Sequence, residues 1–182
     1  MGVPTHEQEA GIDTARIAIG GDSAGGNLAA VVAVLARDAG LPMPAHKVLV
    51  YPAIAAYRDS DSHLEFAQQD TLTRRLIPWF HEQYLDYEAG DHTEPRWAQL
   101  LTDDLSRLPS VTIVLAGCDA LRDEGHAYAT RLAEAGREVT LKVYEGKTHP
   151  FFSWSGAVDQ ARQAVTFAAR QLGEALGDAP ID

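Results

Sequence analysis

The 182-residue sequence has few of the features that mark a nucleic-acid-binding, membrane or disulfide-stabilised protein. Its 15 Lys and Arg residues are outnumbered by 26 Asp and Glu residues, so the formal charge is -11 and a phosphate-rich partner would be repelled. The single cysteine, Cys118, excludes an intrachain disulfide. The longest apolar stretch, from Leu28 to Ala36, is far too short to cross a bilayer. We therefore expect no nucleic-acid partner and no membrane span.

The sequence also lacks the motifs of common metal and cofactor sites. It contains no H-E-x-x-H and no paired cysteines that could ligate a metal, and no G-x-G-x-x-G or Walker motif that could hold a nucleotide. The first residues contain no apolar stretch of the kind that forms a signal peptide. We therefore expect no metal, no cofactor and a cytoplasmic protein.

Four short apolar runs predict buried β-strands, and helical patterns lie between them. Strands that alternate with helices form a parallel sheet with right-handed crossovers. The sequence therefore predicts an α/β fold with a mainly parallel sheet of about four strands flanked by helices. The expected strands cover residues 16–20, 47–51, 111–117 and 138–144.

Three helices are expected around this sheet. The first, at about 24–38, is apolar on nearly every side and should be buried. The second, at about 123–135, begins with Asp123 and Glu124, which suit the positive end of a helix dipole. The last, with its apolar residues spaced three and four apart over 158–172, is amphipathic and should pack on the sheet.

The length of the chain indicates a single domain over residues 1–182. A long excursion at about 56–109, between the second and third strands, carries one further helical pattern among Asp, Ser, Thr and Pro. In a compact α/β domain such an excursion usually covers something or lines a pocket.

Residues 21–25, Gly-Asp-Ser-Ala-Gly, lie between the first expected strand and the first expected helix. Small residues on both sides of Ser23 let the backbone take the strained turn of a nucleophile elbow, which exposes the serine hydroxyl. The alternative is a glycine-rich turn in which Ser23 only caps the helix. A nucleophilic serine also needs a base and a carboxylate that orients the base.

Candidates for both follow later strands. Asp119 comes directly after the third strand, and His149 comes just after the fourth, at the sheet edge where ligand-facing residues gather. Alone, Asp119 could equally be the cap of the next helix. The order serine, acid, histidine is that of the α/β-hydrolases, and the joint placement favours that fold. The other six histidines follow no strand end and are expected at the surface: His6, His46, His63, His81, His92 and His126.

At these residues the chain closely resembles the hormone-sensitive-lipase-like family of α/β-hydrolase carboxylesterases. The resemblance implies that Ser23 is the nucleophile, His149 the general base and acid, and Asp119 the orienting carboxylate. It also implies that the backbone N–H of Ala24 helps to bind the oxyanion. The matching segments are residues 20–29, 49–52, 103–109, 119–125 and 148–152.

The resemblance covers only the C-terminal half of the family. Full-length members place before this point a cap region, the first strands of the sheet and a His-Gly-Gly-Gly loop that donates N–H groups to the oxyanion. Losing one such donor typically costs about 2.7–4 kcal/mol, so weak activity is expected. Two positions also depart from the family: Ala120 replaces the usual Pro, and Pro150 replaces the usual Gly and either aims or misplaces His149.

The expected function is hydrolysis of short-chain acyl esters, a small-molecule substrate class, through an acyl-enzyme on Ser23. Leu121 and Phe151 are expected to contribute to the acyl pocket. Residues 16–20 would form an apolar strand edge, which predicts a homo-oligomer. The alternative is a truncated, weakly active or inactive relative that works as a binding or assembly module. Hydrolysis of amides by the same triad is also open.

Overall fold

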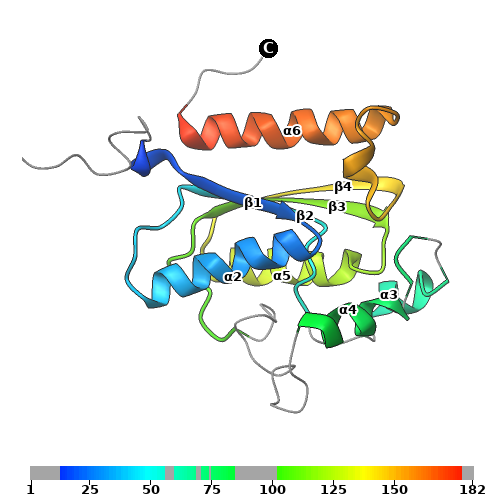
Figure 1. Ribbon diagram of the computed structural model, residues 1–182. Coiled ribbons are helices and arrows are strands. Elements are labelled where there is room, and N and C mark those ends of the chain that lie inside the picture. The colour runs from blue at the N-terminus through cyan, green and yellow to red at the C-terminus, as the bar shows by residue number, and fades with distance from the viewer. Residues whose placement is uncertain (1–12, 56–59, 69–70, 74, 85–101, 178–182) are drawn as a thin grey trace, which may run out of the picture.

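A computed structural model describes residues 13–55, 60–68, 71–73, 75–84 and 102–177 of the chain (Figure 1). Its sheet has four strands in the order β1-β2-β3-β4, and each strand pairs in parallel with the next. The predicted α/β fold with a parallel sheet is confirmed. The strands are β1 (Ala18–Asp22), β2 (His46–Val50), β3 (Ser110–Cys118) and β4 (Val139–Thr148).

Helices cover both faces of the sheet. The helices α2 (Ala24–Asp38) and α5 (Arg122–Glu134) lie on one face, and α6 (Asp159–Leu176) lies on the other (Figure 1). The three long helices thus begin and end within a few residues of the predicted positions. The remaining helices are short: η1 (Thr14–Arg16), α3 (Asp61–Glu65), α4 (Leu76–Tyr84) and η4 (Phe151–Trp154).

The strand β3 shows why the sheet carries helices on both sides. Successive side chains of a strand point to opposite faces. Ile113 and Leu115 therefore pack against α2 and α5, whereas Val114 and Ala116 pack against α6. Every residue from Val111 to Gly117 is buried, as its continuous apolar sequence predicts for a central parallel strand.

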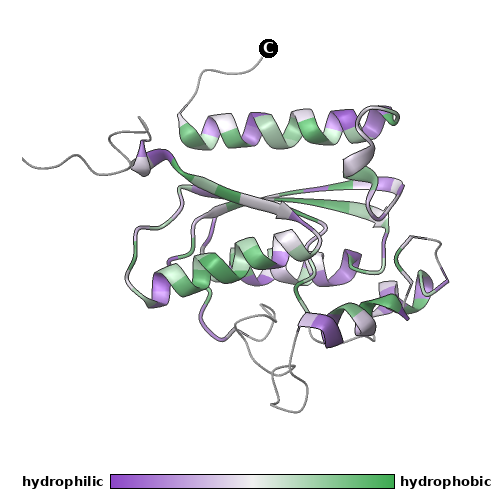
Figure 2. Ribbon diagram, in the orientation of Figure 1, coloured by the Kyte–Doolittle hydropathy of each residue, from purple (hydrophilic) through white to green (hydrophobic). Residues whose placement is uncertain are grey.

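The helix α2 is buried on one side only, so the prediction that it is buried all round is wrong. Its small residues Ala29, Ala30, Ala33 and Val34 pack on the sheet and are at most 3% exposed. Its larger residues form a stripe on the opposite side, because positions 28, 32 and 35 share a helix face. Leu28, Val32 and Leu35 are 49%, 45% and 43% exposed, and Figure 2 shows hydrophobic residues along most of this helix.

Three of the histidines expected at the surface are buried instead: His46, His63 and His81. The reason is visible for His46, whose ring nitrogens lie 2.8 Å from Ser110 Oγ and 2.9 Å from Thr112 Oγ1 on the neighbouring strand. A buried imidazole is tolerated where such polar partners exist. His126 is half-buried, and His6 and His92 lie outside the described residues.

Residues 60–68, 71–73 and 75–84 of the 56–109 excursion pack beside the carboxyl ends of the strands, whereas residues 102–109 lead into the amino end of β3. Ser62 ties α3 to α5, because its Oγ donates to the carbonyl of Ala120 at 2.7 Å and its N–H donates to Asp123 at 2.8 Å. Ile77 of α4 and Leu72 pack with Ala120 and Leu121 in a small apolar cluster. The segments around α3 and α4 therefore lie over the same edge of the sheet as the predicted catalytic residues.

Candidate active site

Ser23 stands on a strained turn between β1 and α2. Its φ is 52°, a left-handed value that is uncommon for a residue with a side chain. The glycines around it allow this turn: a Cβ on Gly21 would overlap the backbone of Gly25, and a Cβ on Gly26 would lie 2.8 Å from Pro52 Cβ. Ser23 occupies the cap position of α2, but its side chain makes no capping hydrogen bond. Its hydroxyl is therefore free to face another group.

That group is His149, and the three residues predicted from strand ends come together. His149 Nε2 lies 3.0 Å from Ser23 Oγ, and His149 Nδ1 lies 2.9 Å from Asp119 Oδ2. A carboxylate only accepts hydrogen bonds, so the neutral imidazole donates from Nδ1 and accepts the serine proton at Nε2. Asp119 also accepts from the N–H of Leu121 at 3.0 Å, just before α5. Its carboxylate therefore contacts both the start of the next helix and the imidazole, as the two interpretations of the sequence had it.

The imidazole is held by packing as well as by hydrogen bonds. Tyr51 directly follows β2, and its ring centre lies 4.4 Å from that of His149. Asp119 is fully buried and His149 is 7% exposed, so water reaches little of the pair. Pro150, whose effect on His149 the sequence left open, is compatible with an imidazole aimed at both partners.

A cavity of about 500 Å³ opens over Ser23 and His149. Ala24, at the start of α2, lines it, and the first N–H groups of a helix have no acceptor within the helix. Leu121 lines it as expected, but Phe151 does not, because it is buried between Tyr51 and Tyr144. The other walls are mainly apolar and come from α2, the loop after β2, the 56–109 excursion and the turn after β4: Leu28, Ala53, Leu72, Ile77, Phe80, His81, Tyr84 and Pro150.

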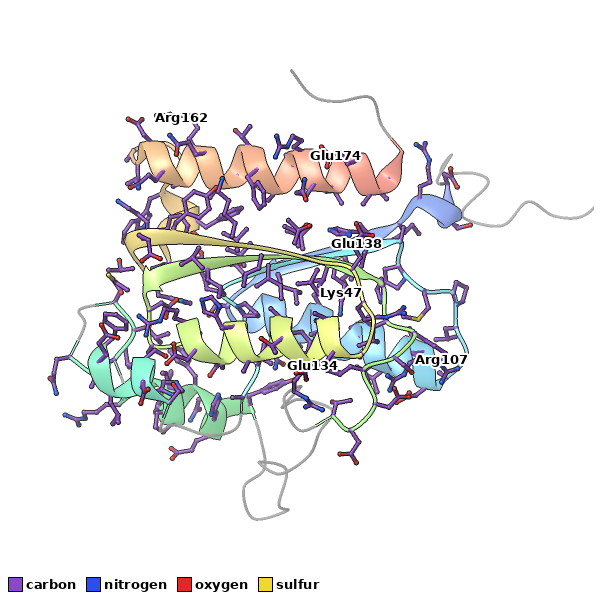
Figure 3. The ribbon with its side chains drawn as sticks, turned by 180° about the vertical axis from the view of Figure 1, so that it is seen from behind. Lys47, Arg107, Glu134, Glu138, Arg162 and Glu174 are labelled. Atoms are coloured by element: carbon purple, nitrogen blue, oxygen red, sulfur yellow. The ribbon has the colours of Figure 1, made fainter. Side chains whose placement is uncertain are left out.

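A larger, shallower groove of about 740 Å³ runs along α6. It is lined by charged residues such as Lys142 and Arg162, and its lining includes none of Ser23, Asp119 and His149. Figure 3 shows Arg162 on the outer side of α6, the side that faces away from the sheet. We therefore place the candidate active site in the smaller cavity.

One buried acid beside the cluster has a role that the sequence did not indicate. Glu124, assigned above to the helix dipole, points inward from α5 and is 3% exposed. Its Oε1 accepts from the N–H of Ile54 at 2.6 Å and of Ala55 at 3.3 Å, and its Oε2 lies 3.7 Å from His63 Nε2. Burial, together with the negative charge of Asp119, raises the pKa of Glu124 to about 8. The sequence signal for this burial was the position of Glu124 four residues before Tyr128, on the apolar side of α5.

The described residues contain no group of three or more His, Cys, Asp or Glu side chains that could hold a metal ion. None of the helices in the described ranges combines the length and apolar character needed to cross a membrane.

A family model for the alpha/beta hydrolase fold matches residues 2–153. The chain belongs to this α/β-hydrolase family. Among its relatives, it is 44% identical to the carboxylic ester hydrolase LipN of Mycobacterium tuberculosis over 76% of this chain and 38% of that protein. It is 34% identical to the ethyl acetate hydrolase of Pseudomonas putida over 91% of this chain and 52% of that protein.

Solved α/β-hydrolase structures agree with these relatives. The thermostable carboxylesterase EstE1, cloned from a metagenomic library, superposes with a TM-score of 0.87 at 37% identity, over 92% of this chain and 57% of EstE1. The hyperthermophilic esterase of the archaeon Pyrobaculum calidifontis gives a TM-score of 0.87 at 35% identity, over 94% of this chain and 57% of the esterase. The resemblance to carboxylesterases seen in the sequence is confirmed, and the chain spans about half the length of the relatives it matches.

Proposed function

We propose that this α/β-hydrolase chain acts as a serine carboxylesterase on short-chain acyl esters. The observation that carries the proposal is the line of hydrogen-bonding distances from Ser23 Oγ through His149 to Asp119 at the base of an apolar cavity. This arrangement is the triad geometry of serine hydrolases.

In the first half of the reaction, Ser23 Oγ attacks the ester carbonyl while His149 Nε2 takes its proton. The negative charge that develops on the carbonyl oxygen is stabilised by the N–H of Ala24 and by the positive end of the α2 dipole. The tetrahedral intermediate then collapses, and the leaving oxygen receives the proton from His149 and departs as the alcohol. Asp119 holds the imidazole in the required tautomer and stabilises its charged form.

In the second half, a water molecule attacks the acyl group on Ser23 and His149 accepts its proton. The intermediate collapses to the carboxylic acid, and the proton returns to Ser23 Oγ. A second N–H donor to the oxyanion would raise the rate roughly a hundred- to thousandfold. We propose Ala24 as the donor supplied by the described residues, and weak activity for the chain alone.

Short acyl chains are favoured by the size of the cavity. At about 500 Å³ it falls in the lower part of the range for small-molecule sites, and Leu121, Leu72 and Ile77 close its inner side. One relative is named for a short-chain ester, the ethyl acetate hydrolase, and another is named a carboxylic ester hydrolase.

The second candidate function is a binding or assembly module, and the exposed apolar surface favours it. Ile17, just before the edge strand β1, is 45% exposed, and the α2 residues Leu28 and Val32 are also exposed. Such edges pair with other chains. We propose that a second copy of this chain covers the surface, so that light scattering at micromolar concentration detects a dimer or larger oligomer. A monomer would contradict this. The oligomer and the cytoplasmic location both stay predictions.

The test of the esterase proposal is hydrolysis of p-nitrophenyl acetate and butyrate by the purified chain and by Ser23→Ala prepared identically. We expect turnover by the wild type, and acetate rates at background in the variant. Labelling with a fluorophosphonate, which forms a Ser23 Oγ–phosphorus bond and expels fluoride, should also occur only in the wild type. Equal background rates of hydrolysis in both proteins, together with no labelling, would reject the esterase proposal and favour the binding or assembly module.

A further inference from the structure

The short loop after β2 joins two of the three catalytic positions. On one side it contacts the nucleophile turn: the N–H of Ala53 donates to the carbonyl of Ser23 at 3.2 Å, and Asn27 Nδ2 donates to the carbonyl of Ala53 at 2.7 Å. The N–H groups of the next two residues, Ile54 and Ala55, point the other way, toward α5. This loop therefore lies between the serine and the helix that follows Asp119.

Glu124 is the side chain that fastens the loop to α5. Its Oε1 receives both N–H groups, and Ile54 and Ala55 are 0% and 2% exposed, so water does not replace the acceptor. Glu124 lies in the first turn of α5, which begins where the N–H of Arg122 donates to the carbonyl of Asp119 at 3.0 Å. A continuous set of contacts thus runs from Ser23 through the loop and Glu124 to Asp119.

We propose, on the basis of the esterase function above, that Glu124 is a positioning residue that sets the distance between the serine turn and the Asp119–His149 pair. It touches no reacting atom. Its effect comes from holding the two loops that carry the triad, and misplacement of a catalytic group by about 1 Å can lower the rate about a hundredfold.

The burial of Glu124 distinguishes this role from the helix-dipole role expected from the sequence. An acid that serves the dipole lies at the exposed first turn, whereas both oxygens of Glu124 face protein groups. Burying a carboxyl group without function is unfavourable, and an apolar side chain could fill the same space. What an apolar side chain cannot do is accept two N–H groups of the Ala53–Ala55 loop.

The test compares Glu124→Gln and Glu124→Ala. The Gln amide oxygen still accepts from Ile54 and Ala55, whereas Ala leaves both N–H groups buried without an acceptor. The matched control is Leu132→Ala, which removes a fully buried side chain from the same helix two turns further along, away from the loop. All proteins are measured below the lowest melting temperature, so each is folded.

Two readouts are used. The rate of fluorophosphonate labelling at Ser23 should fall about ten- to hundredfold in Glu124→Ala, and stay within about threefold of wild type in Glu124→Gln and Leu132→Ala. The downfield proton resonance of His149 Nδ1–H, which reports its hydrogen bond to Asp119, should persist in wild type and Glu124→Gln and broaden or shift in Glu124→Ala. The second readout needs no catalytic activity.

The outcomes are separable. Labelling of Glu124→Ala at the wild-type rate with an unchanged His149 resonance would overturn the positioning role while the esterase proposal stands. An equal loss in Leu132→Ala would also overturn it, because the effect would then be general loosening of α5. A wild type that is never labelled would reject the esterase proposal, and the His149 resonance would still decide whether Glu124 positions the pair.

Discussion

Replacing Lys47 with methionine should stabilise the protein. Lys47 belongs to β2 and lies between the sheet and α5 (Figure 3), with its side chain fully buried. Its ammonium lies 5.6 Å from the centre of the Tyr128 ring and has no hydrogen-bond partner within the described residues. Burial, together with the nearby Arg37 guanidinium, lowers the pKa of Lys47 from 10.5 to about 8.

The magnitude follows from the two pKa values of Lys47. Each pH unit between 10.5 and about 8 corresponds to about 1.4 kcal/mol, so the buried charge destabilises the folded state by about 3 kcal/mol at pH 7. Methionine has nearly the same length and no charge, but it loses the cation–π contact with Tyr128, worth about 0.5–2 kcal/mol. The net gain is about 1–3 kcal/mol, or a rise in melting temperature of about 2–10 °C for a chain of this size.

The dependence on pH gives an independent check. Below about pH 8, Lys47 is protonated in both the folded and the unfolded state, and the full penalty applies. Between about pH 8 and 10.5 the unfolded chain keeps the proton that the folded chain has lost, so the free energy of unfolding rises with pH. Across this interval, the free energy of unfolding of the wild type should therefore rise by about 3 kcal/mol relative to that of Lys47→Met.

The assay is urea unfolding, followed by circular dichroism, at about pH 7, 9 and 10.5. The control is Lys147→Met, which changes a partly exposed lysine of β4 and should alter stability by less than about 0.5 kcal/mol. A less stable Lys47→Met at pH 7, or parallel pH profiles for wild type and variant, would refute the reasoning, because the ammonium would then have a stabilising partner.

Three further predictions concern the site. Asp119→Asn should fold normally and lower kcat for p-nitrophenyl acetate about 10⁴-fold, because the amide stabilises the wrong imidazole tautomer; a loss under tenfold would contradict the triad role. Gly26→Ala should lower the free energy of unfolding by about 1–3 kcal/mol, because the new methyl overlaps Pro52, whereas Gly156→Ala faces open space and should change little in the same urea titration. Phe80→Ala should raise KM for the butyrate about fivefold with kcat nearly unchanged, because this half-exposed ring lines the cavity; equal KM values would remove α4 from the acyl site.

The strand ends explain how much of the site was predictable from sequence. Ser23, Asp119 and His149 each follow a buried strand, and parallel strands bring their carboxyl ends to one edge, so position in the sequence implied proximity in space. The fold followed from the same alternation of strands and helices. Pro150 was undecided, because a restricted backbone angle alone does not say where an imidazole points.

Burial was harder to predict than position. The helix that carries Leu28 and Val32 was predicted to be buried, but which side of an apolar helix is buried depends on the elements that pack against it. Phe151 was predicted to contribute to the acyl pocket, but the chain turns into η4 and packs the ring against Tyr144. Glu124 lies in the first turn of α5 as predicted, but its contacts were not predictable, because its carboxylate accepts from backbone N–H groups, which do not depend on residue type.

The triad and the oxyanion donor are two distinct parts of the proposed catalytic machinery. The pair of bonds from His149 to Ser23 and Asp119 is supported by Tyr51 packing and by the loop that Glu124 holds. Oxyanion stabilisation, by contrast, has Ala24 as its donor here. Attack on a fluorophosphonate and ester turnover both depend on the activated serine and on the oxyanion donor, because the phosphoryl oxygen also gains negative charge. The His149 Nδ1–H resonance, by contrast, reports the triad alone. A normal resonance with slow labelling and slow turnover would therefore locate the deficit at the oxyanion, and a lost resonance would locate it in the triad itself.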